Sequence, residues 1–319
     1  MRYRTLGRTG LEVSELGFGA WGIGRDAWVG ADDDESLRAL RAAIEHGVNF
    51  LDTAYAYGDG RSEQLVGAAA RESAETVYVA TKVPPKNWEW PARPGQRPEE
   101  VFPADWIVSC TERSLEKLGL ETIDVQQLHV WSDDWVGQGD WLDTIERLKR
   151  DGKIRFFGVS INDHQPGNAL RLVESGVVDT VQVIYNLFDQ SPEDALFPAV
   201  EAAQVGVIVR VPFDEGALTG AVRADTTFPE GDFRNEYFAG GRKREAWERV
   251  QAIARDLGVE VDGLAEVALR FCLSHPAVSV VIPGMRSTRN VERNVRAASA
   301  GPLSESQLTA LRPHRWAAP

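Results

Sequence analysis

The feature of this sequence that most constrains its fold is a regular alternation of short β-branched runs with amphipathic helical segments. Most of the runs are continuously apolar, which is typical of strands covered on both faces. We expect strands at residues 13–18, 49–53, 77–83, 123–130, 154–160, 180–186, 207–212 and 278–283. We expect helices at residues 33–45, 62–71, 103–118, 141–150, 165–174, 192–204, 242–257 and 264–274. The last two helices are consecutive, so one of them is extra to the alternation.

This order of elements predicts an α/β fold, either a closed parallel barrel or a long doubly wound sheet. No linker interrupts the order, and 43% of the 319 residues are hydrophobic, enough for one large core. We therefore expect a single domain over residues 1–319. The connections at residues 84–102 and 213–240 are too long for turns. Such stretches are usually functional loops, and plain surface insertions are the alternative.

The charge balance excludes some classes of partner. A net charge of −13 argues against a broad surface for nucleic acid or membrane, because both need an excess of Lys and Arg. Cys110 and Cys272 lie far apart in apolar contexts, so we expect two buried thiols. The opening residues do not resemble a signal peptide and no apolar run could span a membrane, so we expect a cytoplasmic protein. The sequence leaves homo-oligomerisation open.

A glycine pattern near the start needs a separate interpretation. Gly17, Gly19 and Gly22 match the G-x-G-x-x-G dinucleotide fingerprint and follow a predicted strand. In that fingerprint the last glycine opens a helix, but here the helical pattern starts only near Asp33. We therefore disfavour a Rossmann unit. We expect these glycines to let the backbone pass close to a bound ligand.

Four polar residues follow three neighbouring predicted strands. Asp52 and Tyr57 come at and just after the end of the second strand, Lys82 ends the third, and His129 ends the fourth. The carboxyl ends of parallel barrel strands meet at one mouth, so these side chains should converge on one pocket. An interior Lys82 needs a carboxylate partner, and Asp52 is the available candidate. A purely structural ion pair is the alternative for these two.

At this point the sequence resembles the aldo-keto reductases. The motifs are DTAYAYG at 52–58, ATK at 80–82, LH at 128–129 and GVS at 158–160, in the family's order and spacing. The resemblance runs from LGRTGLEVSELGFGAW near the start to IPGMRSTRNVERN near the end. It implies a single-domain (β/α)8 TIM barrel with an N-terminal β-hairpin and extra C-terminal helices.

The resemblance also implies a reaction, the NADP(H)-dependent reduction of a small-molecule carbonyl by hydride transfer. Tyr57 would donate the proton, and Lys82 would lower the pKa of that phenol. Asp52 would hold Lys82, and His129 would hydrogen-bond the carbonyl oxygen. Tyr55 competes for the role of acid, but the family pattern places the acid immediately before Gly58.

The residues that the resemblance assigns to the cofactor are Gly19, Ala20, Trp21, Ser160, Asn162, Gln182, Arg210, Pro212, Phe213, Gly216, Leu218, Gly284, Arg286, Arg289, Asn290, Arg293 and Asn294. Three of them depart from the family pattern. Asn162 stands one residue later than usual, Arg210 replaces a common aromatic residue, and Arg293 replaces a common Glu. The arginines after Gly284 suit a 2′-phosphate, which favours NADP over NAD, and a solvated basic helix face is the alternative.

We expect Trp21, Trp88 and Trp131 to wall the substrate site, although a plain core role is the alternative for each. An aromatic wall suits an aldehyde, a ketone or a sugar. No metal-site motif occurs. The rival interpretations are an NADP-binding sensor on the same barrel with slow turnover, and a lyase or isomerase that uses Lys82 as a Schiff base. Asp52 opposes the second, because it keeps the lysine charged.

Overall fold

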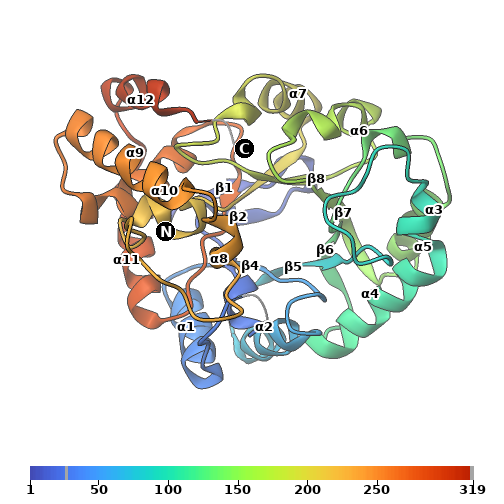
Figure 1. Ribbon diagram of the computed structural model, residues 1–319. Helices are drawn as coiled ribbons and strands as arrows, with labels where there is room; N and C mark the ends of the chain where they lie inside the picture. The colour runs from blue at the N-terminus through green and yellow to red at the C-terminus, as the bar shows by residue number, and fades with distance from the viewer. Residues whose placement is uncertain (26–27, 317–319) are drawn as a thin grey trace.

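The protein is built around a barrel of eight parallel strands (Figure 1). The computed structural model describes residues 1–25 and 28–316. The strands follow one another around the sheet in sequence order: β3 Phe18–Gly19, β4 Phe50–Asp52, β5 Tyr78–Val83, β6 Ile123–Leu128, β7 Ile154–Ser160, β8 Thr180–Ile184, β9 Gly206–Arg210 and β10 Val280–Val281. Parallel bridges from Leu16 to Val281 and from Gly19 to Gly284 join β3 to β10 and close the barrel. The predicted (β/α)8 barrel is confirmed, and the doubly wound sheet is excluded.

Helices surround the barrel in Figure 1. Within the described residues, the helices that follow the eight strands in turn are α1 Asp33–Glu45, α2 Arg61–Glu72, α4 Ala104–Leu118, α5 Trp141–Arg150, α6 Leu170–Ser175, α7 Leu196–Ala203, α10 Leu264–Ser274 and α11 Thr288–Ser299. Outside this alternation lie α3 Pro98–Val101, α8 Arg234–Tyr237, α9 Arg242–Leu257 and α12 Glu305–Leu311. Helix α9 is the predicted extra helix. Helices α3 and α8 lie inside the two segments that were expected to be irregular loops.

Helix α5 shows why these segments are helical. Its buried side chains are Trp141, Thr144, Ile145 and Leu148, a spacing of three and four that places them on one face. Its last turn carries basic residues, which suit the negative end of the helix dipole. The predicted bounds of this helix are confirmed.

An N-terminal hairpin closes the bottom of the barrel. Strands β1 Tyr3–Thr5 and β2 Glu12–Ser14 pair antiparallel. Residues from the hairpin pack on interior side chains of the barrel strands, and this cluster contains Leu6, Leu11, Val13, Phe50, Ala80, Val125, Ile208, Val280 and Ile282. The prediction of one strand at 13–18 is therefore wrong. Val13 pairs with Arg4 in the hairpin, and the barrel strand begins only at Phe18.

The barrel interior changes from apolar to polar along its axis. Phe50 and Ala80 belong to the apolar cluster at the bottom. Two residues further along the same strands, Asp52 and Lys82 meet in an ion pair. Because alternate residues of a strand face the same side, the interior rows of β4 and β5 change from apolar side chains at the bottom to a charged side chain near the carboxyl end. The fold thus places these charged side chains together at one mouth of the barrel.

The glycine pattern belongs to the seam where the barrel closes. A Cβ on Gly19 would lie 2.5 Å from the carbonyl oxygen of Ile282, and one on Gly22 would lie 2.9 Å from the Arg286 side chain. A short 3-10 helix, Trp21–Ile23, follows, and no dinucleotide-type helix opens at Gly22. The glycines therefore let β3 pass against the segment after β10. Gly19 and Gly22 also line the cavity described below, so close approach to a bound ligand stays a prediction.

Candidate active site

A cavity of about 1430 Å³ opens where the strands end. Typical ligand pockets are about 300–1,000 Å³, so this one has room for more than a single small molecule. The predicted cofactor residues that line it are Gly19, Ala20, Trp21, Ser160, Asn162, Gln182, Arg210, Pro212, Phe213, Gly216, Gly284, Arg286, Arg289, Asn290, Arg293 and Asn294. Leu218 is the exception, because its side chain is fully buried in the core. Both long loops contribute to the lining, as expected of functional loops.

Lys82 is the centre of the polar cluster at the bottom of this cavity. Its side chain is fully buried, and its Nζ lies 2.6 Å from Oδ1 of Asp52 and 2.7 Å from the carbonyl oxygen of Thr53. The same Nζ lies 3.3 Å from the Tyr57 hydroxyl. Burial by itself would lower the pKa of Lys82, but Asp52 and Tyr57 outweigh it and the pKa is raised. The lysine is therefore a fixed cation beside the phenol.

The pKa of Tyr57 differs from the sequence prediction. Burial raises it above the ordinary value for a tyrosine, and the charge of Lys82 counters that rise only in part. The prediction of a net lowering is wrong for the protein by itself, because desolvation of a phenolate is the larger effect. Tyr57 thus remains protonated at neutral pH. Its ring lines the cavity, so the hydroxyl is a hydrogen donor within reach of a bound molecule.

His129 is held as a neutral imidazole. Burial, followed by the charges of Lys82 and Arg210, lowers its pKa well below the ordinary value. Its ring lies 5.7 Å from the Tyr57 ring, at 73°. Its Nδ1 is buried with no hydrogen-bond partner among the described residues. A neutral imidazole has one N–H to donate, so His129 can hold an oxygen near the Tyr57 hydroxyl without adding charge.

Two glutamines complete the cluster around Asp52. Nε2 of Gln182 donates to Oδ2 of Asp52 at 2.7 Å, and Nε2 of Gln127 donates to the same oxygen at 3.2 Å. Gln182 also donates to Oε1 of Gln127 at 3.2 Å. Both Asp52 oxygens therefore have partners. Gln127 was not among the predicted site residues, although it lies on the interior row of β6, two residues before His129.

Trp131 does not line the cavity, which corrects the expectation that it walls the substrate site. It is fully buried, and its ring packs edge-on against Trp135 and Trp141 at 5.6 and 5.1 Å. The tryptophan beside His129 is instead Trp90, whose ring lies 5.7 Å away at 86°. Trp21, Trp88 and Trp90 all line the cavity. Sequence reasoning missed Trp90, which stands only two residues from the predicted Trp88.

Arg210 is a second positioned cation near the polar cluster. Its Nη2 donates to the carbonyl oxygen of Ile161 at 2.9 Å and pairs with Oδ1 of Asp163 at 2.7 Å. Its Nε is buried without a hydrogen-bond partner among the described residues. The charge of Arg210 lowers the pKa of both Tyr57 and His129, although it is one of the smaller contributions in each case. Its two contacts therefore fix the guanidinium close enough for its charge to act on Tyr57 and His129.

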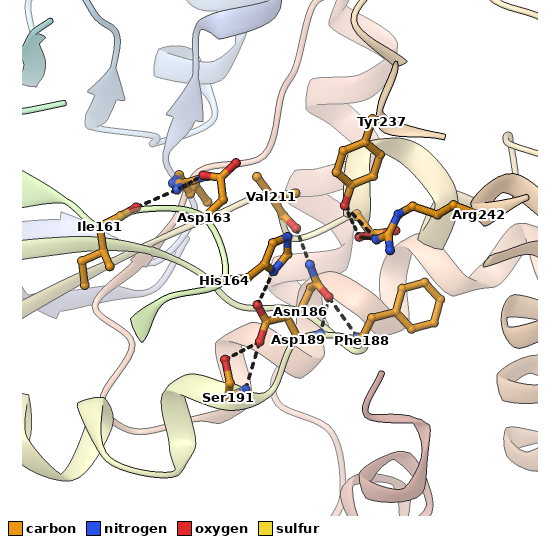
Figure 2. A network of polar contacts seen from close by, with 12 residues as sticks. Ile161, Asp163, His164, Asn186, Phe188, Asp189, Ser191, Val211, Tyr237 and Arg242 are labelled. Carbon is orange, nitrogen blue, oxygen red and sulfur yellow. Dashed lines mark hydrogen bonds and ion pairs between the residues drawn. The ribbon is translucent and has the colours of Figure 1, made fainter. Parts of the chain in front are cut away.

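A polar network fixes the loop that follows Arg210 (Figure 2). Val211 has φ +56°, a conformation rare for a β-branched residue, and its carbonyl oxygen accepts a 2.9 Å bond from Asn186 Nδ2. Asp214 accepts bonds from the Tyr237 hydroxyl at 2.6 Å and from Arg242 at 3.1 Å. These contacts join the loops after β8 and β9 to α8 and α9. The cavity wall from 211 to 216 is thus held by side chains far away in sequence.

Basic residues line the far end of the cavity, on and near α11. Arg289, Arg293 and Arg296 are exposed and make no hydrogen bond or ion pair with any described residue. Ser287 caps the helix by accepting from Asn290 N. Asn162, by contrast, already bonds within the protein, since its side chain contacts Trp131 N and Gln165 at 3.4 and 3.3 Å. The arginines are therefore the better candidates for holding an anionic ligand.

Three further findings concern the chain as a whole. Among residues 1–25 and 28–316, no group of three or more His, Cys, Asp and Glu side chains could hold a metal ion. Across the same residues, no helix is long and apolar enough to cross a membrane. Cys110 and Cys272 are buried free thiols, as expected.

Comparisons with known proteins agree with this geometry. A model of the aldo/keto reductase family matches residues 15–315. The aldo-keto reductase YhdN of Bacillus subtilis (strain 168) is 30% identical over 297 residues, which cover 92% of this chain and 87% of that protein. The solved holo form of aldo-keto reductase AKR11C1 from Bacillus halodurans has a TM-score of 0.77 and 29% identity, covering 100% and 97% of the two chains. Glycerol dehydrogenase AKR11B4 from Gluconobacter oxydans has a TM-score of 0.74 and 29% identity, covering 95% and 92%.

Proposed function

The chain belongs to the aldo/keto reductase family of oxidoreductases, and from that premise we propose that it reduces an aldehyde, ketone or sugar carbonyl to the alcohol with NADPH. The observation that carries the proposal is the position of Lys82, between Asp52 at 2.6 Å and the Tyr57 hydroxyl at 3.3 Å. That arrangement presents one protonated phenol to the cavity with a fixed cation behind it. It supports Tyr57 as the proton donor.

The residues of the cavity fit an NADP(H) molecule. The unpartnered Arg289 and Arg293 at one end suit a 2′-phosphate, and NADP is therefore favoured over NAD. Gly216 and Gly284 leave open space, since a Cβ there would meet at most one atom at 3.6 Å. The buried Nε of Arg210 is an unused donor in the middle. When bound, NADPH supplies the hydride that the carbonyl carbon accepts.

The protein's own residues account for the proton. As the carbonyl carbon gains a hydride, the carbonyl oxygen gains negative charge and takes the Tyr57 proton. The phenolate that remains is stabilised by Lys82, which Asp52 holds in place. His129 donates its N–H to the same oxygen and fixes its approach. One hydride and one proton convert C=O to CH–OH, and Tyr57 regains a proton from solvent.

The decisive experiment follows NADPH absorbance while the purified protein meets a panel of aldehydes, ketones and aldoses. The proposal predicts oxidation of NADPH with at least one class of carbonyl. Tight binding of NADPH without turnover of any compound would instead favour the alternative function, an NADP-binding sensor on the same barrel. A binding titration of NADPH, run beside the kinetics, separates these outcomes from a failure to bind.

Replacing Arg289 and Arg293 together with Gln should weaken NADPH binding at least about tenfold and leave NADH binding nearly unchanged. A hydrogen bond to a charged group contributes about 1.5–3 kcal/mol, and only NADPH carries the 2′-phosphate. Fluorescence titration of the tryptophans measures both dissociation constants. Arg150→Gln, an exposed arginine of α5 outside the cavity, is the matched control. An equal loss of affinity for NADPH and NADH would show that these arginines do not bind the 2′-phosphate.

Cofactor binding should also weaken as the pH rises from 7 to 9. Glu215 lines the cavity, and burial, with the nearby charges of Asp214 and Asp163, raises its pKa to about 8. It is mostly neutral at pH 7 and becomes an anion above pH 8, where it repels the phosphates. One added charge at close range corresponds to about fivefold in Kd, or ~1 kcal/mol. Glu215→Gln should flatten this pH dependence, and a variant with an unchanged profile would contradict the assignment.

A further inference from the structure

Seven aromatic rings form a continuous chain of contacts around the Tyr57 hydroxyl. In order, the centroids of Trp88 and Trp90 lie 5.8 Å apart, Trp90 and His129 5.7 Å, His129 and Tyr57 5.7 Å, and Tyr57 and Trp21 6.3 Å. From Trp21 the chain branches to Trp28 at 6.1 Å and Phe233 at 5.1 Å. All seven side chains line the cavity. The space into which Tyr57 donates its proton is therefore bounded by ring faces and edges.

The wall of the cavity formed by the segments after β3, β4, β5 and β6 carries almost no charge. The segments that follow β3, β4, β5 and β6 contribute, besides the rings, only small or apolar lining residues and one carboxylate, Asp52. Asp52 is committed to Lys82, and His129 is neutral. The charged lining residues are otherwise Asp163, Arg210, Glu215, Arg223, Asp262, Glu266, Arg286, Arg289, Arg293 and Arg296, which come from β7 onward. A charged or many-hydroxyl substrate would thus lose hydrogen bonds to water here without gaining protein partners.

The two outermost rings are held in place yet uncovered. Trp88 is 51% exposed and Trp90 is 44% exposed, and only two other large hydrophobic residues in the described chain, Tyr3 and Val29, are comparably exposed. Hydrogen bonds from other elements fix their loop, since Trp106 Nε1 donates to the carbonyl oxygen of Pro84 and Trp135 Nε1 to that of Gln96, at 2.8 and 2.7 Å. Two positioned, uncovered indoles beside a proton donor are a surface for a flat apolar molecule.

We propose that the carbonyl substrate is a planar, uncharged, conjugated compound, an aromatic aldehyde or ketone, whose ring lies against Trp90 while its oxygen reaches Tyr57 and His129. This inference rests on the proposed function, because it names the substrate class of the same site. Stacking favours such a ring over a saturated one of the same size. The absence of polar partners disfavours aldoses and carboxylate-bearing aldehydes.

The test compares kcat/KM for NADPH oxidation with benzaldehyde, cyclohexanecarbaldehyde, 4-carboxybenzaldehyde and xylose. Benzaldehyde should exceed each of the others at least about tenfold, since an aromatic ring contact is worth about 2- to 10-fold and two tryptophans are available. Conjugation makes the benzaldehyde carbonyl less reactive, so such a preference must come from the protein. Inhibition by benzyl alcohol, compared with cyclohexylmethanol, gives the same contrast as a binding constant without reference to turnover.

Variants of Trp90 test whether this residue causes the preference for an aromatic ring over a saturated one. Trp90→Leu should lower the ratio of benzaldehyde to cyclohexanecarbaldehyde by about 2- to 10-fold, and Trp90→Phe should retain most of it. Because the indole is half exposed, neither change empties the core. Tyr3→Leu removes an equally exposed aromatic residue outside the cavity and should leave the ratio unchanged.

The outcomes separate two kinds of failure. A preference for xylose, the carboxylate or the saturated ring overturns this inference while the reductase proposal stands. An equal loss of both rates in Trp90→Leu also overturns it, because a structural role for Trp90 would not distinguish the two rings. If no carbonyl of any class oxidises bound NADPH, the proposed function fails and this inference fails with it.

Discussion

Replacing Tyr57 with Phe is expected to lower kcat for carbonyl reduction by about 10²–10⁴-fold, the usual contribution of a positioned general acid. The phenyl ring can keep the ring contacts at 5.7 Å to His129 and 6.3 Å to Trp21, so the cavity should keep its shape. Binding of NADPH should be unchanged. The loss therefore belongs in kcat and in kcat/KM alike, the signature of an interaction made only in the transition state. Stopped-flow absorbance of NADPH measures it without interference from product release.

Tyr55→Phe is the matched control for this experiment. Tyr55 stands two residues earlier in the same loop and also carries a buried phenol, but its hydroxyl contacts Arg113, at 3.5 Å, and not Lys82. Burial raises its pKa, and no buried lysine stands behind it to stabilise a phenolate. We expect Tyr55→Phe to retain activity. Loss of activity in Tyr55→Phe with retention in Tyr57→Phe would reverse the assignment of the acid.

The polar centre was predictable because of where its residues stand in the strands. Asp52, Lys82 and His129 each stand at or next to the carboxyl end of a barrel strand, and the ends of parallel strands must meet at one mouth of a barrel. The cost of burying an unpaired ammonium then links Lys82 to Asp52. The same parity argument could have found Gln127, since it shares the interior row of β6 with Val125. Gln127 is a polar residue on an otherwise apolar interior row, and that pattern points to a buried polar contact.

The positions of the tryptophan side chains could not be predicted in the same way. Trp131 and Trp90 both follow strands that contribute to the site, but a loop has no periodicity that fixes the direction of a side chain. Trp131 turns into a buried cluster with Trp135 and Trp141, whereas Trp90 faces His129. The hydrogen bonds that shape the loop of Trp90 come from Trp106 and Trp135, on other elements. Local sequence therefore carries little information about which ring lines the cavity.

The barrel seam was hard to predict for a related reason. Strands β3 and β10 are only two residues long, Phe18–Gly19 and Val280–Val281. The segment at 13–18 crosses from the hairpin into the barrel, and Val13 pairs with Arg4 instead of a barrel strand. Hydrophobicity alone does not mark that change of partner. The close approach of Gly19 to Ile282 shows where the chain enters the barrel, but this contact is visible only in the structure.

Replacing Lys82 with Met is expected to remove most activity and to destabilise the fold by about 3–5 kcal/mol, because it leaves Asp52 as a buried charge without its cation. Lys82 is fully buried and Asp52 is 2% exposed, so water cannot compensate. Gln127 and Gln182 still donate to Asp52, which should keep the loss near the lower end of that range. Urea unfolding followed by tryptophan fluorescence measures the change in unfolding free energy.

The double variant Lys82→Met with Asp52→Asn separates stability from chemistry. Removing both charges takes away the unpaired carboxylate, so the double variant should recover most of the unfolding free energy lost in Lys82→Met. Activity should not recover, because no cation then stands 3.3 Å from the Tyr57 hydroxyl to stabilise the phenolate. A double variant that regains both stability and kcat would show that Asp52 and Lys82 are only a structural ion pair. One that regains stability alone assigns Lys82 to the proton transfer from Tyr57.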